Sequence, residues 1–103
     1  MSITGNDLDN VLNGTAGDDT INALGGSDVI NALGGADSVS GGDGSDVADG
    51  GAGLDTLLGG AGNDTLTGGT EADLLSGGAD NDRAAGGAGD DTLLGEAGAD
   101  SLA

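Results

Sequence analysis

An acidic residue recurs at every ninth position through almost the whole chain. Counted in units of nine from Gly5, the sixth residue of each unit is Asn10, Asp19, Asp28, Asp37, Asp46, Asp55, Asp64, Asp73, Asp82, Asp91 or Asp100. Carboxylates are hard oxygen ligands, and Ca²⁺ takes six to eight such oxygens in a flexible geometry. Mg²⁺ demands a tighter octahedron, and Zn²⁺ favours His or Cys, which this sequence lacks. The Asp column therefore indicates calcium chemistry, provided that the fold brings successive carboxylates together.

Glycines surround each Asp at fixed offsets. The unit reads Gly-Gly-x-Gly-x-Asp-x-apolar-x, as in residues 59–67, and runs without insertion over residues 5–103. Glycine at the first, second and fourth positions permits positive φ and close backbone approach, which a tight loop needs. We expect the backbone carbonyls of these loops to supplement the carboxylates as ligands. Four loops keep all three glycines: Gly41, Gly42, Gly44; Gly50, Gly51, Gly53; Gly59, Gly60, Gly62; and Gly86, Gly87, Gly89.

Other loops carry a side chain where the pattern has its second or fourth glycine: Leu8, Leu24, Leu33, Glu71 and Asp80. Glu71 and Asp80 either distort their loops, because positive φ is unfavourable for such residues, or add ligands. Asn10 offers a neutral oxygen in place of a carboxylate. We therefore expect the gaps that use Asn10 to be the emptiest. The gaps expected to bind best are those centred on Asp46, Asp55 and Asp64.

The eighth position of each unit is always apolar, and this column predicts the strands that connect the loops. It reads Leu12, Ile21, Ile30, Val39, Ala48, Leu57, Leu66, Leu75, Ala84, Leu93 and Leu102. Each x-apolar-x triplet predicts a three-residue strand with its middle side chain inward, and each strand is stabilised by stacking on its copies. Two strands and two loops then close one 18-residue coil. Loops one coil apart stack on two edges, six on one and five on the other, which leaves at most nine gaps for ions.

Composition excludes several classes of protein. The 103 residues leave room for one domain and include 19 acidic residues against the single base Arg83, a net charge of −18. Such a chain should repel nucleic acid and anionic membranes and attract cations. No apolar run is long enough to insert into a membrane, and residues 1–4 carry no secretory signal. Eleven small apolar side chains make too little core to order 25 glycines, so bound divalent ions should assist folding.

This pattern resembles the RTX (haemolysin-type calcium-binding nonapeptide repeat) family over residues 5–103, with residues 1–4 as the end of a preceding repeat or an N-terminal edge. The resemblance implies an all-β fold, a right-handed parallel β-roll or β-solenoid. It also implies several Ca²⁺ ions between stacked loops, held by the sixth-position Asp and loop carbonyls. Such segments leave the cell by type I secretion and fold in extracellular calcium. The family includes secreted proteases, lipases, epimerases, toxins and adhesins, so a parent protein could carry a separate catalytic domain.

Several alternatives remain open at this point. A Gly/Asp-rich acidic chain is often a disordered spacer, and Asp also recurs in turns for its own backbone hydrogen bonds. Paired carboxylates can catalyse acid–base reactions, but here the coil accounts for every Asp column, so we expect no enzyme activity from this segment. An ice-binding solenoid would need a more regular outward array. A structural or adhesive extender is also compatible with the repeat. Bare solenoid ends could self-associate end to end, and the sequence identifies no protein partner.

Overall fold

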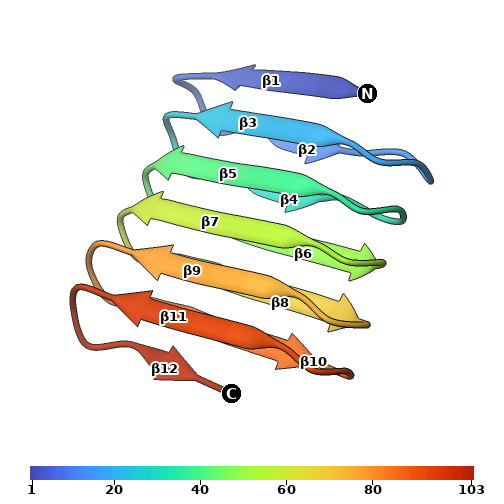
Figure 1. The fold of residues 1–103 in the computed structure, drawn as a ribbon. Helices are drawn as coiled ribbons and strands as arrows, with labels where there is room; N and C mark the ends of the chain where they lie inside the picture. The colour runs from blue at the N-terminus through green and yellow to red at the C-terminus, as the bar shows by residue number, and fades with distance from the viewer.

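The computed structural model describes all of residues 1–103 and consists of twelve β-strands joined by short loops (Figure 1). It contains no helix that is long and apolar enough to cross a membrane. The strands are β1 (Ser2–Asn6), β2 (Val11–Asn13), β3 (Thr20–Leu24), β4 (Val29–Asn31), β5 (Ser38–Asp43), β6 (Val47–Ala52), β7 (Thr56–Ala61), β8 (Thr65–Thr70), β9 (Leu74–Gly78), β10 (Arg83–Gly87), β11 (Thr92–Glu96) and β12 (Ser101–Leu102).

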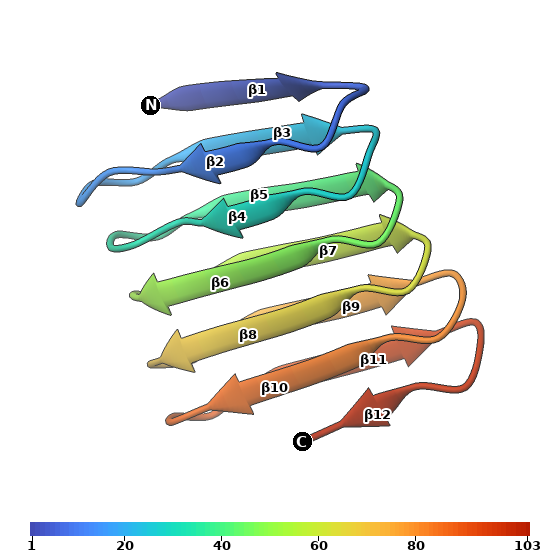
Figure 2. The ribbon, with the colours of Figure 1, turned by 180° about the vertical axis from the view of Figure 1, so that it is seen from behind.

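Alternate strands build two parallel sheets that face each other. One sheet has the order β1-β3-β5-β7-β9-β11 and the other β12-β10-β8-β6-β4-β2. The chain passes from one sheet to the other at every loop, so it winds as a flattened coil with its termini at opposite ends (Figures 1 and 2). Each pairing joins residues 18 apart, as Thr65 with Arg83 and Leu57 with Leu75. The predicted parallel β-solenoid with 18 residues per coil is confirmed.

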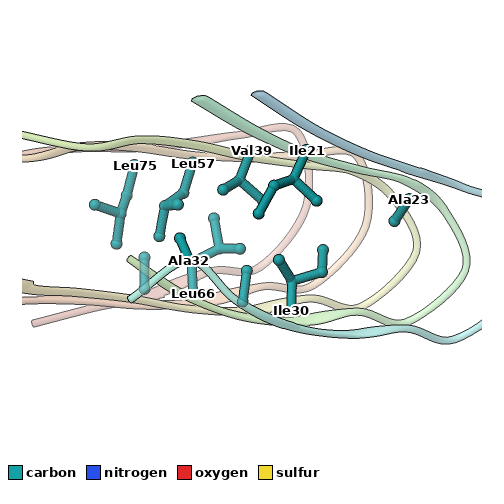
Figure 3. Close-up of a cluster of buried hydrophobic side chains, with 10 residues drawn as sticks. Ile21, Ala23, Ile30, Ala32, Val39, Leu57, Leu66 and Leu75 are labelled. Carbon is teal, nitrogen blue, oxygen red and sulfur yellow. The ribbon is translucent and has the colours of Figure 1, made fainter. Parts of the chain in front are cut away.

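The eighth-position side chains form a single narrow core between the sheets (Figure 3). Ile21, Ile30, Leu57, Leu66 and Leu75 are each at most 1 % exposed. Towards the ends the column is less covered, because an end strand has a neighbour on one side only. The core is one aliphatic side chain thick, so loop contacts must carry much of the remaining stability.

Most strands are longer than the predicted three residues. In β8 the strand continues past Thr67 through Gly68 and Gly69 to Thr70, and Gly69 pairs with Gly51 and Gly87 in the adjacent coils. The two glycines extend the ladder because, without side chains, their backbones can approach the next coil closely. After the six-residue strands β5, β6, β7 and β8, only positions four to six remain in the loop. The three-residue prediction holds only for β2 and β4.

Five residues other than glycine adopt positive φ: Leu24, Leu33, Glu71, Asp80 and Glu96, with φ of 68–79°. These values lie close to the left-handed helical region, which costs an L-residue on the order of 1–2 kcal/mol. The prediction that Glu71 and Asp80 need positive φ is confirmed. The coil continues regularly through both, since β9 and β10 follow in register. These substitutions add strain to their loops without breaking the stack.

Candidate metal centre

The loops bring the sixth-position side chains to the inside of the two edges. Eight of these carboxylates are at most 3 % exposed: Asp19, Asp28, Asp37, Asp46, Asp55, Asp64, Asp73 and Asp82. Asp91 and Asp100 are partly exposed, as is Asn10. An ionised carboxylate is rarely buried without a partner, because the loss of hydration costs several kcal/mol. Each buried Asp therefore needs a partner, and the structure shows what its two oxygens contact.

From Asp28 onwards, one carboxylate oxygen of each sixth-position Asp accepts a hydrogen bond from the preceding coil. The backbone N–H of Asp46 donates to Oδ1 of Asp64 at 2.8 Å, and that of Asp55 donates to Oδ1 of Asp73 at 2.9 Å. The same bond recurs in all nine gaps, from the pair Asn10 and Asp28 to the pair Asp82 and Asp100, at 2.7–2.9 Å. The bond fixes the carboxylate's orientation and leaves its second oxygen, Oδ2, for another partner.

The second oxygen has no hydrogen-bond partner in seven of the buried carboxylates. These orphan atoms are Oδ2 of Asp28, Asp37, Asp46, Asp55, Asp64, Asp73 and Asp82. A buried acceptor without a donor costs about 1–3 kcal/mol, and more when it is charged. Seven in one small chain, all at the same repeat position, fit a cationic ligand, because a cation can satisfy a buried carboxylate oxygen that has no donor.

A backbone carbonyl of the next coil faces the same place as the orphan oxygens of Asp46, Asp55, Asp64 and Asp73. A Cβ atom built on Gly59 would lie 2.5 Å from Oδ2 of Asp64 and 2.6 Å from the carbonyl oxygen of Gly77. For Gly50 the corresponding distances are 2.5 Å to Asp55 and 2.8 Å to Gly68. Thus a carboxylate oxygen and a carbonyl oxygen converge beside a first-position glycine, in what we call the first-position space. Hard oxygens of these two kinds are the ligands of Ca²⁺.

The structure nowhere gathers three or more Asp or Glu side chains into one metal-binding cluster. Any gap must therefore combine one or two carboxylates with backbone carbonyls, as the sequence predicts. The additional acidic residues are partly engaged elsewhere. Asp80 accepts the Gly62 N–H through Oδ2 at 3.0 Å, and the Glu96 carboxylate accepts the hydroxyl proton of Ser76.

Burial shifts the titration of the orphan carboxylates. Desolvation raises the pKa of Asp64 to about 7, although the hydrogen bond from the Asp46 N–H opposes the shift. Desolvation also raises the pKa values of Asp37, Asp46, Asp55, Asp73 and Asp82. Neighbouring carboxylates in the stack add to the effect. A nearby cation would reverse the shift, because it favours the charged form.

The first two loops differ, because their own donors satisfy the sixth residue. The Thr15 N–H donates to Oδ2 of Asp19 at 2.6 Å, the Thr15 hydroxyl donates to the same carboxylate at 3.0 Å, and the N-terminal ammonium lies 3.3 Å from its Oδ1. The Thr15 backbone bond, as the main cause, lowers the pKa of Asp19. In the first loop the Asn6 N–H donates to Oδ1 of Asn10 at 3.0 Å. The loops of Asn10 and Asp19 therefore lack the orphan Oδ2 that the loops from Asp28 to Asp82 have.

A second ladder runs through the fifth position and was not predicted from the sequence. Oδ1 of Asn63 accepts the Asn81 N–H at 2.9 Å, and Oδ1 of Asn81 accepts the Ala99 N–H at 2.8 Å. Asp9 and Asp18 make the same bond to the next coil. The sequence signal is the recurrence of Asp, Asn or Ser at the fifth position. It is concentrated on the edge that carries Asn10, so the loops of that edge are linked more tightly.

Comparison with known proteins agrees with this geometry. The model of the family described as RTX calcium-binding nonapeptide repeat matches four times, over residues 4–39, 32–66, 40–75 and 67–102. The chain belongs to this family. No curated protein matches the sequence. This RTX chain therefore combines the family's repeat with a β-solenoid whose buried carboxylate oxygens lack protein partners.

Proposed function

We propose that this chain is a calcium-responsive module that folds when several Ca²⁺ ions bind between its stacked loops. The column of orphan Oδ2 atoms carries the proposal, since each is buried, charged and without a donor. The first-position space beside Asp46, Asp55, Asp64 and Asp73 fits the group, because it presents a carboxylate oxygen and a carbonyl oxygen. The ion would supply positive charge and complete the coordination of these oxygens.

The chain's own residues explain why folding and binding should be coupled. Without an ion, stacked carboxylates one coil apart repel each other, and their burial is unfavourable. The glycine-rich loops also lose much conformational entropy on ordering. Asp64 and the Gly77 carbonyl of the next coil would hold the ion, and its positive charge would offset the repulsion between the coils. Each ordered loop forms half of the next gap, so binding should be cooperative.

The same coupling fits a secreted protein, as the family resemblance implies. We propose that the segment stays unfolded where calcium is scarce and folds in extracellular calcium. The carboxylate column serves the coil, so we assign no catalytic residue to this segment. A catalytic activity of the parent protein would belong to another domain.

Far-UV circular dichroism during a calcium titration, starting in chelator and ending at millimolar calcium, tests the proposal. We expect a sigmoidal transition from coil to β-structure with Ca²⁺, and none with Mg²⁺ at the same concentrations. Magnesium should fail because it requires a tight octahedron and keeps its waters. A spectrum that is already fully β in chelator, or one that never becomes β, would contradict ion-driven folding.

Replacing Asp55 by Ala should weaken calcium-induced folding more than replacing Asp100. The Asp55 carboxylate accepts the Asp37 N–H through Oδ1 and presents its orphan Oδ2 beside the Gly68 carbonyl of the next coil, whereas the Asp100 carboxylate accepts only the Asp82 N–H of the preceding coil. Each variant loses one hydrogen bond to a charged group, which contributes about 1.5–3 kcal/mol, but only Asp55→Ala also removes an orphan oxygen from a gap, so we expect a calcium midpoint roughly tenfold higher for Asp55→Ala. Asp100→Ala should shift it by clearly less.

The exposed Asp49, on the outer face of β6, provides the control. Asp49→Ala removes the same charge without touching a gap, so its midpoint should match the wild type. Equal shifts for Asp55→Ala and Asp100→Ala would refute the stacking scheme.

A further inference from the structure

The nine gaps are not equivalent, because the residue at the first position differs between loops. In the loops of Asp46, Asp55, Asp64, Asp73 and Asp82 this residue is Gly41, Gly50, Gly59, Gly68 or Gly77. In the loops of Asp28 and Asp37 it is Ala23 or Ala32. Both alanines are fully buried within the core, and Figure 3 shows Ala23 inside the coil, close to where the chain turns.

A methyl group at the first position lies in the space on which the oxygens converge. A Cβ built on Gly41, Gly50, Gly59, Gly68 or Gly77 would approach the Oδ2 of its own loop to 2.4–2.5 Å, closer than real Cβ atoms come. The glycines at this position have no positive φ, so the loop needs them for space and not for backbone conformation. At Ala23 and Ala32 a methyl group stands at the corresponding position.

We infer that five of the nine gaps accept an ion, and that the first-position residue decides this for the seven gaps that begin at an Asp with an orphan Oδ2. This inference rests on the proposed function. The gaps that begin at Asn10 and Asp19 are closed by the loop's own donors, and those that begin at Asp28 and Asp37 are closed by the Ala23 and Ala32 methyl groups. The open gaps are those that begin at Asp46, Asp55, Asp64, Asp73 and Asp82, which all have an orphan Oδ2 and a first-position glycine.

The orphan oxygens of Asp28 and Asp37 differ from those of the open gaps in the first-position residue of their loops, which is Ala23 or Ala32. Both lack a donor, as in the open gaps, but the first position of each loop carries a buried alanine. A single methyl group is thus enough to separate a gap that binds from one that does not. Ca²⁺ needs its oxygens at 2.3–2.6 Å, so it cannot share the first-position space with a carbon atom.

Counting bound calcium on the full chain tests this, by equilibrium dialysis at saturating CaCl₂ followed by atomic absorption. We expect about five ions per wild-type chain, as counted from the geometry. Ala32→Gly should raise the count by one, because it opens the gap that begins at Asp37. The matched control is Ala72→Gly, the same substitution at an exposed fifth position on the same edge, which should leave the count unchanged.

The reverse substitution, glycine to alanine in an open gap, gives a second test in case Ala32→Gly does not fold. Gly59→Ala should lower the count by one, because its methyl would fill the space between Asp64 and Gly77. Gly34→Ala, whose new Cβ would meet nothing closer than 3.6 Å, should not change it. A wild-type count of seven or more, or equal counts for Ala32→Gly and Ala72→Gly, overturns the inference. A wild type that binds no calcium overturns the proposed function itself, so the two failures are distinguishable.

Discussion

Gly69→Ala should raise the calcium midpoint for folding more than tenfold or abolish the transition. Gly69 lies in β8 with φ of 111°, beyond the left-handed region that Leu24 or Glu71 can occupy at 76°. A Cβ there would lie 2.0 Å from the carbonyl oxygen of Gly51 in the adjacent coil. The oxygen belongs to packed backbone and the Cβ is attached directly to the backbone, so the clash is relieved only if two coils separate. Backbone strain of this kind costs on the order of 1–3 kcal/mol before the clash is added.

Gly34→Ala is the matched control for Gly69→Ala. It makes the same change in composition and in unfolded-chain entropy, but its φ is not positive and its nearest new contact is 3.6 Å away. Far-UV circular dichroism at increasing calcium should give a wild-type curve for this variant. If both variants behave alike, the loss in Gly69→Ala comes from general glycine chemistry and not from coil stacking.

The architecture could be predicted from the sequence because two columns, Asp at the sixth position and an apolar residue at the eighth, repeat with one period. A period of nine with an alternating triplet such as Thr65 to Thr67 allows few ways to bury its middle residue. Strand length was predicted less well. The side chains alone do not show that Gly68 and Gly69 continue the ladder, since glycine is compatible with both a loop and a strand.

The site could be predicted only in outline. The repeat shows that Asp55 and Asp73 lie on one edge, but not that each carboxylate uses Oδ1 for the preceding coil and leaves Oδ2 free. That division depends on atomic geometry that a pattern does not contain. The same holds for Thr15, which stands where the pattern has its second glycine. The sequence does not show that its backbone N–H and hydroxyl both donate to Oδ2 of Asp19. Departures from the repeat therefore decide how the loops differ in function.

In the absence of calcium, lowering the pH from about 8 to about 5 should favour the folded coil. Asp64 has its pKa raised by burial to about 7, against 3.8 for the free side chain, and five further carboxylates shift in the same direction. A group whose folded pKa is raised contributes stability below its unfolded pKa and loses it as pH rises through the folded value. For Asp64 this window lies between pH 3.8 and about 7. The β-signal in chelator should rise as the pH falls through it.

Asp64→Asn should stabilise the coil without calcium and destabilise it with calcium. The two opposite effects distinguish the cost of burying the Asp64 charge from its role as a calcium ligand. In chelator at about pH 8 the variant should be more folded than the wild type, because it removes a buried charge whose ionisation is unfavourable. Its amide could also donate towards the Gly77 carbonyl, which faces the same space. With saturating calcium it should be less stable, since a neutral amide is the weaker ligand.

Two control variants isolate the cause. Asp49→Asn removes an exposed charge of the same sign, so it reports the relief of general repulsion alone. Asp19→Asn should destabilise the chain even in chelator, because the Thr15 donors hold that carboxylate in its charged form and its pKa is lowered. If Asp64→Asn behaves like Asp49→Asn in chelator, the buried charge is not what opposes folding. If it also folds as well as the wild type in calcium, Asp64 is not a ligand, and the role of the whole column would have to be reassigned.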